Sequence, residues 1–200
     1  MSLAATHIPA AAFPTAQPRP QGRRLWGVPV VVVLFILGMV MPTALSVSAG
    51  TLRLSAYRVV LLIAFLPMVF LLISGRCGRL TVFDGLAVAH SVWALLALIN
   101  WGGFGQGLES GGIYIVEALG AYLVGRCYIR SVEDYMAMAR LYVVLVVGML
   151  LFTIPESLTG VHFLKDTPAS IFGGSKAHYI DKRMGLERAF GSFDHPILYG

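Results

Sequence analysis

The sequence predicts an all-α, polytopic bundle of transmembrane helices. Of its 200 residues, 57% are hydrophobic and only 12% are charged, whereas soluble domains carry about 25% charged residues. The apolar residues also gather into separate long runs, and about 20 mainly apolar helical residues are enough to cross the hydrocarbon core of a membrane. The composition therefore excludes an ordinary soluble domain, and the runs predict several membrane-spanning helices.

Five runs are long enough, or nearly so, to cross the membrane, and a sixth begins at the end of the sequence. The fourth run is the shortest and contains Glu117. The predicted spans are residues 25–45, 56–73, 83–100, 112–125 and 139–155, with the start of a sixth at 196–200. Because this sixth run is cut off at Gly200, we expect that the chain is the N-terminal part of a longer protein.

The segments outside the spans complete the predicted organisation. Residues 1–24 are rich in Ala and Pro and have little to bury, which predicts a disordered cytoplasmic tail. Residues 25–155 would hold the five spans, and residues 156–195 would form a long periplasmic loop. The Gly-rich residues 101–112 match no nucleotide-binding fingerprint, and we expect a flexible outside hairpin there.

The distribution of basic residues predicts a cytoplasmic N-terminus, because cytoplasmic loops carry an excess of Lys and Arg. In this orientation the first two outside loops hold only Arg53 and Arg58. The cytoplasmic segments hold Arg19, Arg23, Arg24, Arg76, Arg79, Arg126, Arg130 and Arg140. The long loop is also basic and breaks this pattern, so either the orientation is inverted or the loop needs positive charge for its function.

Cys77 and Cys127 both lie in a Gly-Arg-Cys sequence at the predicted cytoplasmic end of a span. Disulfides are rare in the reducing cytoplasm. We therefore expect two free thiols.

His90 and Glu117 are ionisable residues inside predicted spans. Such residues are costly in a membrane and are candidates for function. The structural alternative is a neutral His90 that is hydrogen-bonded to a neighbouring helix, and a Glu117 that reaches water or pairs with an arginine such as Arg53. A transporter built around His90 and Glu117 is the main alternative function, and a non-catalytic partner in envelope assembly is another.

Three arginines are candidates for binding an anionic group at the outer face. Arg53 and Arg58 lie at the outside end of the second span, although contact with lipid head groups is an alternative role. Arg188 lies in the final stretch RAFGSFDHPILYG. There Gly191 permits a tight turn, while His195 and Pro196 suit the start of a helix. An arginine fork beside a helix N-terminus is a plausible phosphate site.

The same stretch resembles a known motif. Arg188, Gly191, Phe193 and Pro196 resemble the arginine-glycine-aromatic-proline motif of the O-antigen ligase and O-antigen polymerase superfamily of bacterial membrane glycosyltransferases. The segment IPESLTGVHF, residues 154–163, is similar to the segment that follows the preceding span in many members. The resemblance covers the N-terminal half of such proteins.

This resemblance implies a GT-C-like enzyme of the bacterial inner membrane that works without a cofactor, a metal or a nucleic acid. Its donor would be a glycan on undecaprenyl diphosphate, and its acceptor the lipid A core of lipopolysaccharide or a growing polysaccharide such as an exopolysaccharide. Arg188 would hold the diphosphate, with Arg53 and Arg58 as further candidates.

The resemblance also implies where the catalytic base lies. In the family it is a histidine in a second large periplasmic loop, which we expect beyond Gly200. His195 is not assigned that role, because a residue at the start of a helix is the simpler explanation. The 200 residues alone are therefore expected to be inactive.

Overall fold

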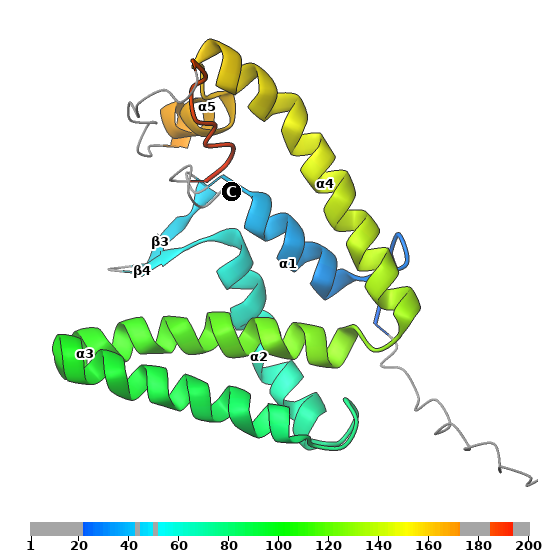
Figure 1. Cartoon of the computed structure of the whole chain (residues 1–200). Helices are drawn as coiled ribbons and strands as arrows, with labels where there is room; N and C mark the ends of the chain where they lie inside the picture. The colour runs from blue at the N-terminus through cyan, green and yellow to red at the C-terminus, as the bar shows by residue number, and fades with distance from the viewer. Residues whose placement is uncertain (1–21, 43–44, 50–51, 173–184, 194–200) are drawn as a thin grey trace, which may run out of the picture.

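The computed structural model describes residues 22–42, 45–49, 52–172 and 185–193, and Figure 1 shows that these ranges are mostly helical. The five helices are α1 (Val30–Val40), α2 (Ala56–Ile73), α3 (Val82–Tyr128), α4 (Val132–Thr159) and α5 (Phe163–Phe172). Two antiparallel hairpins accompany them, β1 (Arg24–Leu25) with β2 (Val28–Pro29) and β3 (Val47–Ala49) with β4 (Leu52–Leu54).

Three of the helices in the described ranges, α2, α3 and α4, are long and apolar enough to cross a membrane. Helix α2 coincides with the second predicted span. The first predicted span is shorter than expected, because a β-hairpin occupies residues 24–29 and α1 has only 11 residues. The helical class is thus confirmed, but the count of five spans is not.

The long helix α3 is a hairpin of two helical arms. Its only residue with non-helical dihedral angles is Gly103, with φ 75° and ψ 169°, and Figure 1 shows the two green arms running side by side. A Cβ atom on Gly107 would collide with the backbone of Ile99, and one on Gly111 with the side chain of Leu95. The predicted hairpin between the third and fourth spans is therefore present, with its turn at Gly103, but the rest of residues 101–112 is helical and not a loop. Gly107 and Gly111 let the two arms touch.

The buried core lies where α1 meets α2, the second arm of α3 and α4. At the crossing of α1 and α2, a Cβ on Gly38 would lie 2.8 Å from the backbone nitrogen of Tyr57. The two helices can therefore approach this closely only because residue 38 has no side chain. The core side chains include Val32, Leu61, Met68, Leu123 and Leu141.

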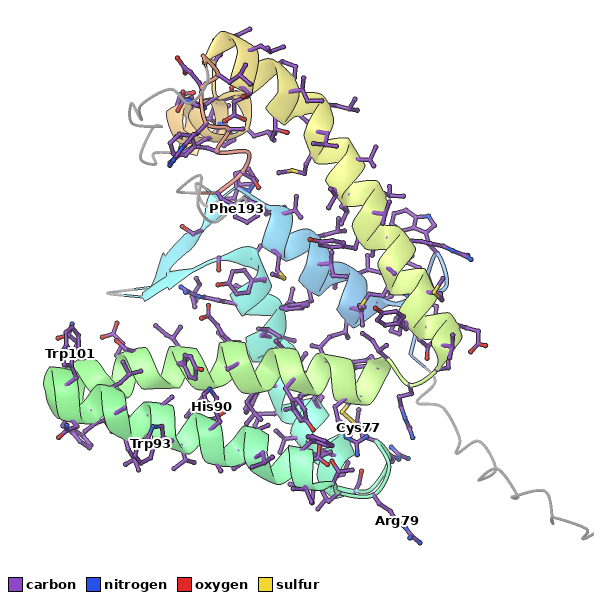
Figure 2. The ribbon with its side chains drawn as sticks, in the orientation of Figure 1. Cys77, Arg79, His90, Trp93, Trp101 and Phe193 are labelled. Carbon is purple, nitrogen blue, oxygen red and sulfur yellow. A yellow bond between two sulfur atoms is a disulfide. The ribbon has the colours of Figure 1, made fainter. Side chains whose placement is uncertain are left out.

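Large apolar side chains outside this core face the surroundings of the protein. Trp93 is 70% exposed, Trp101 is 87% exposed and Leu151 is 73% exposed. Figure 2 shows Trp101 at the turn of the α3 hairpin and Cys77 at its opposite end. Such large exposed apolar surfaces are typical of a protein that contacts lipid.

Cys77 and Cys127 form a disulfide, with their Cα atoms 4.9 Å apart, so the expectation of free thiols is wrong. The α3 hairpin returns residue 127 to the connection between α2 and α3, where both cysteines are fully buried. Arg126 strengthens the same junction, because its guanidinium donates to the carbonyl oxygens of Cys77 (2.6 Å) and Arg79 (2.8 Å). Arg130 likewise donates to the carbonyl of Arg76 at 2.7 Å.

The predicted loop at 156–195 is in part helical. Helix α4 continues to Thr159 and ends at Gly160, whose φ of 72° is left-handed. Such a glycine is a common helix terminator. Helix α5 then follows at Phe163–Phe172, and Figure 1 shows it beside the end of α4, next to residues 185–193 in red.

Candidate functional site

A buried carboxylate at the end of α4 organises the most polar cluster near Arg188. Glu156 is 1% exposed, and its Oε1 accepts hydrogen bonds from the Phe190 backbone nitrogen (2.7 Å) and from His162 Nδ1 (2.6 Å). Its Oε2 accepts from the Gly191 backbone nitrogen at 3.3 Å. A buried carboxylate is tolerated when donors surround it, and here two of the donors belong to a segment more than 30 residues away.

The residues around Glu156 fasten residues 185–193 to α4 in a second way. The Ser157 hydroxyl donates to the Glu187 carbonyl at 2.6 Å, and the Glu187 backbone nitrogen donates to the Ser157 carbonyl at 3.1 Å. A Cβ atom on Gly160 would collide with the Glu187 carboxylate. Gly191 has a φ of 57°, which confirms the turn predicted at that position. The segment therefore has a defined conformation at the end of α4.

Arg188 lies within this fastened segment. Its side chain is half-buried, and no hydrogen bond or ion pair to a described residue engages its guanidinium. The backbone on both sides is held by α4, at Glu187 through Ser157 and at Phe190 through Glu156. The structure thus presents an arginine whose backbone is fixed and whose donors are not engaged by any described residue.

Phe190 is the centre of a small group of cationic and aromatic side chains. Its ring is 1% exposed, and the imidazole of His162 meets it edge to face with the ring centroids 4.8 Å apart. The Nζ atom of Lys165 lies 4.4 Å from the centroid of the same ring, within the range of a cation–π interaction. Lys165 belongs to α5 and His162 directly precedes it. The Phe190 ring therefore joins α5 to the Arg188 segment.

Arg58 has a different environment from Arg188. Its Nε donates to Glu117 Oε1 at 2.6 Å, and the Tyr57 hydroxyl donates to the same oxygen. Glu117 therefore does pair with an arginine, and the partner that the structure describes is Arg58. Arg53 belongs to β4 and its side chain lies outside what the structure describes. Its assignment to phosphate, like that of Arg58, stays a prediction.

His90 has the contact that the structural alternative predicts. Its Nε2 lies 2.7 Å from the Tyr114 hydroxyl, which belongs to the other arm of the α3 hairpin. The hydrogen bond joins the two arms midway along the hairpin. His90 and Glu117 thus both have identified partners within the helices.

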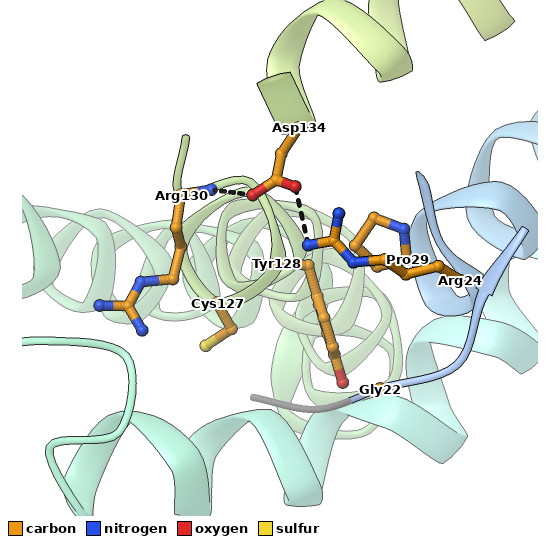
Figure 3. Close-up of a pocket in the computed structure, with 7 residues that line it drawn as sticks. All are labelled: Gly22, Arg24, Pro29, Cys127, Tyr128, Arg130 and Asp134. Atoms are coloured by element: carbon orange, nitrogen blue, oxygen red, sulfur yellow. Dashed lines mark hydrogen bonds and ion pairs between the residues drawn. The ribbon is translucent and has the colours of Figure 1, made fainter. Parts of the chain in front are cut away.

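A second polar cluster lies at the opposite end of α4, and Figure 3 shows the small pocket that it lines. Asp134 is 3% exposed, pairs with Arg24 at 2.8 Å and accepts a hydrogen bond from the Arg130 backbone nitrogen at 3.3 Å. Nearby, the buried Asp84 accepts from the Tyr122 hydroxyl (2.6 Å) and from Arg126 (3.0 Å). The Asp84–Arg126 pair joins the two ends of α3 beside the disulfide, whereas the Arg24–Asp134 pair joins β1 to the start of α4.

The two polar clusters are separated by about the thickness of a bilayer. Glu156 follows Asp134 by 22 residues in one helix, which is about 33 Å of helix, against a hydrocarbon core of about 30 Å. Residues 141–155 between them carry no charged side chain. Helix α4 can therefore place the Arg188 segment at one membrane surface and the disulfide at the other.

Several predicted features lie outside the described residues. They are the tail at residues 1–21, His195, Pro196 and the start of the sixth span up to Gly200. The histidine base expected beyond Gly200 is outside the sequence itself and stays a prediction. Within the ranges that the structure does describe, no group of three His, Cys, Asp or Glu side chains is placed to hold a metal ion.

Sequence reasoning missed Glu156 and His162 as parts of the site. Both lie in IPESLTGVHF, a stretch noticed for its resemblance to other proteins but not for its ionisable residues. The available signal was a carboxylate at the end of an apolar run, followed six residues later by a histidine. Their meeting requires the sharp turn at Gly160, which ends α4.

No protein-family model matches the chain, and no curated protein or solved structure matches it. The fold itself defines a class, a mostly helical protein with three apolar helices that can cross a membrane. A function beyond that class must be argued from the cluster at the end of α4.

Proposed function

We propose that the chain belongs to a metal-independent glycosyltransferase of the bacterial inner membrane, of the O-antigen ligase and polymerase superfamily. In this proposal it transfers or polymerises a glycan carried on undecaprenyl diphosphate at the periplasmic face. The support from the sequence is the resemblance of RAFGSFDHPILYG and IPESLTGVHF to that superfamily. The support from the structure is a single observation, the guanidinium of Arg188, which no described residue engages, on a backbone fixed to the end of a helix long and apolar enough to cross a membrane.

Arg188 suits a diphosphate for electrostatic reasons. Its planar fork can donate two parallel hydrogen bonds to phosphate oxygens. When the bond between the glycan and the diphosphate breaks, negative charge develops on the diphosphate, and a fixed cation stabilises that charge. Because Glu156 already holds the backbone of Phe190 and Gly191, little ordering is needed when the donor binds.

Arg58 is the weaker of the two described candidates. Its guanidinium already donates to Glu117, which neutralises its charge. A diphosphate would have to compete with that carboxylate. The donor is therefore assigned first to Arg188.

The test measures donor binding to the purified protein in lipid nanodiscs, with undecaprenyl diphosphate as the probe. Arg188→Ala removes two charge-assisted hydrogen bonds, which together are worth about 3 kcal/mol or more, so the Kd should rise by at least about 100-fold. Arg188→Lys keeps the charge without the fork and should give an intermediate Kd. Arg79→Ala is the control, since Arg79 is exposed at the disulfide end. An unchanged Kd in Arg188→Ala would remove the diphosphate role.

The same variants separate this proposal from a transporter. In cells, Arg188→Ala at an unchanged protein level should abolish attachment or extension of surface glycan. A transport path through the half-buried Glu117–Arg58 pair predicts instead that Glu117→Gln stops solute flux while glycan assembly continues.

A further inference from the structure

Two guanidinium groups converge on Gly78, in the connection between α2 and α3. A Cβ atom at Gly78 would lie 3.6 Å from Arg126 Nη1 and 3.7 Å from Arg130 Nη2. Arg126 lies in the last turn of α3 and Arg130 follows that helix, so the α3 hairpin returns both side chains to residue 78. Gly78 has a φ of 97°, a left-handed conformation that glycine adopts readily. A side chain at this position would enter the space between the two guanidinium groups.

The two arginines differ in how many of their donors the protein uses. An arginine has five N–H donors. Arg126 makes four hydrogen bonds, two to Asp84 and two to backbone carbonyl oxygens. Arg130 donates from Nη1 to the Arg76 carbonyl oxygen, and no described residue accepts from its Nε or Nη2. The Arg130 guanidinium is therefore held in place at one nitrogen and keeps donors for a ligand.

Positive charge exceeds negative charge at this connection. The two buried carboxylates at this end, Asp84 and Asp134, already have arginine partners. Arg76 and Arg130 form no ion pair with a described residue. Residues 1–21 contain no Asp or Glu, so the N-terminal part of the sequence adds no negative charge. These charges favour an anionic ligand from outside the protein.

The surroundings of Gly78 suit a lipid better than a soluble anion. Large apolar side chains on either side of the connection are exposed, namely Ile73 (74%), Leu80 (66%) and Phe83 (71%). They lie at the ends of α2 and α3, which are long and apolar enough to cross a membrane. A soluble phosphate would leave these side chains in water, whereas a phospholipid covers them with its acyl chains. Basic pockets at the ends of membrane helices are also typical sites for acidic head groups.

We propose that the connection around Gly78 binds an acidic phospholipid. Its phosphodiester oxygens accept hydrogen bonds from Arg130 Nη2 and Nε, beside Arg126, and its acyl chains lie against the exposed apolar side chains of α2 and α3. Arginine is suited to this contact, because its fork matches the geometry of two phosphate oxygens. The site lies at the opposite end of α4 from Arg188 and does not depend on the proposed function.

The experiment titrates phosphatidylglycerol into the full protein in detergent, at about 0.15 M salt, and counts bound lipids by native mass spectrometry. The wild-type protein should bind one phosphatidylglycerol at least about tenfold more tightly than phosphatidylcholine, whose choline cancels the phosphate charge. Arg130→Gln removes the charge and the fork, so the Kd for phosphatidylglycerol should rise by at least about 30-fold.

Two further variants separate the site from misfolding and from general attraction. Arg130→Lys keeps the charge and can still donate to the Arg76 carbonyl oxygen, but it lacks the fork, so the Kd should rise about tenfold. Arg79→Gln is the matched control, because Arg79 is an exposed arginine of the same connection and Figure 2 shows it extending away from the helices. Salt screens such a charge, and the Kd should stay within about threefold of wild type.

Four results would overturn the inference. A Kd within about threefold of wild type in both Arg130 variants removes the site. An equal loss in Arg79→Gln and Arg130→Gln shows general attraction by surface charge. Equal affinity for phosphatidylcholine shows that the head-group charge is not recognised, and equal affinity for glycerophosphoglycerol, which has no acyl chains, shows that the ligand is a soluble anion. Arg188→Ala should leave all these affinities unchanged, so this inference and the proposed function can fail separately.

Discussion

Replacing Glu156 with Gln tests whether this carboxylate fixes the Arg188 segment. The charged oxygens accept three hydrogen bonds in a site that is 1% exposed. Glutamine keeps one acceptor oxygen. Its NH₂ group, which is itself a donor, would then face at least one of the three donors that now bind the carboxylate. A hydrogen bond to a charged group is worth about 1.5–3 kcal/mol and a neutral one about 1 kcal/mol. An unsatisfied buried donor costs about 1–3 kcal/mol.

These costs indicate that the segment loses about 3 kcal/mol of local stability. Since each 1.4 kcal/mol is a factor of ten, the population of the detached segment should rise by about 100-fold. Hydrogen exchange reports this population directly when the amide opens locally. We therefore expect the Phe190 and Gly191 amides to exchange about 100-fold faster in Glu156→Gln, measured by mass spectrometry in nanodiscs.

The control is Glu133→Gln, a carboxylate exposed in the first turn of the same helix. It should leave exchange at Phe190 and Gly191 unchanged. The reasoning is refuted if both amides exchange in Glu156→Gln within about threefold of the wild-type rate, because the carboxylate then does not hold the segment.

Two further predictions concern the membrane orientation and the disulfide. A cysteine introduced at Leu186, which is 47% exposed, should react in intact cells with a membrane-impermeant maleimide. A cysteine introduced at Arg79 should react only after the cells are opened. The reverse labelling pattern would contradict the proposed orientation. The Cys77–Cys127 disulfide closes a stretch of 50 residues, worth about 4 kcal/mol in the chain-entropy account. Reductant should therefore lower the Tm of the wild-type protein but not that of the Cys77→Ala/Cys127→Ala variant, and equal responses would show that the disulfide does not stabilise the fold.

The sequence predicted the helices best where apolar runs were continuous. Helix α2 matches its prediction from Ala56 to Ile73, because Ser55 precedes a long apolar run whose only charged residue is Arg58. The Gly-rich residues 101–112 were expected to form a hairpin, which is present, but the helical structure of most of them was not predicted, for a physical reason. Glycine costs about 1 kcal/mol in a helix in water, but in lipid every backbone group needs a partner within the protein. That requirement favours helix, and Gly107 and Gly111 then permit the close contact of the two arms.

The site could be predicted only in part. Arg188 and Gly191 were proposed from local residue types; the turn at Gly191 is confirmed by its φ of 57°, and the role of Arg188 stays a prediction. The role of Glu156 could not be predicted, since the backbone nitrogens that it binds lie 34 and 35 residues further along the chain. The disulfide was missed for a related reason. Its cysteines are 50 residues apart, and only the hairpin of α3 brings them together.

The orientation of the membrane helices links the disulfide to the proposed chemistry. The arginines at the disulfide end favour the cytoplasm for that end, whereas disulfides are typical of oxidising compartments. Arg126 and Arg130 also bind backbone carbonyls there, so part of this positive charge has a structural use. Helix α4 holds the disulfide end and the Arg188 segment about 33 Å apart. The side of the membrane on which one of them lies therefore determines the side of the other. Glycan transfer at the periplasmic face requires Arg188 outside and hence the disulfide inside, so a periplasmic disulfide end would leave Arg188 unable to meet the donor there.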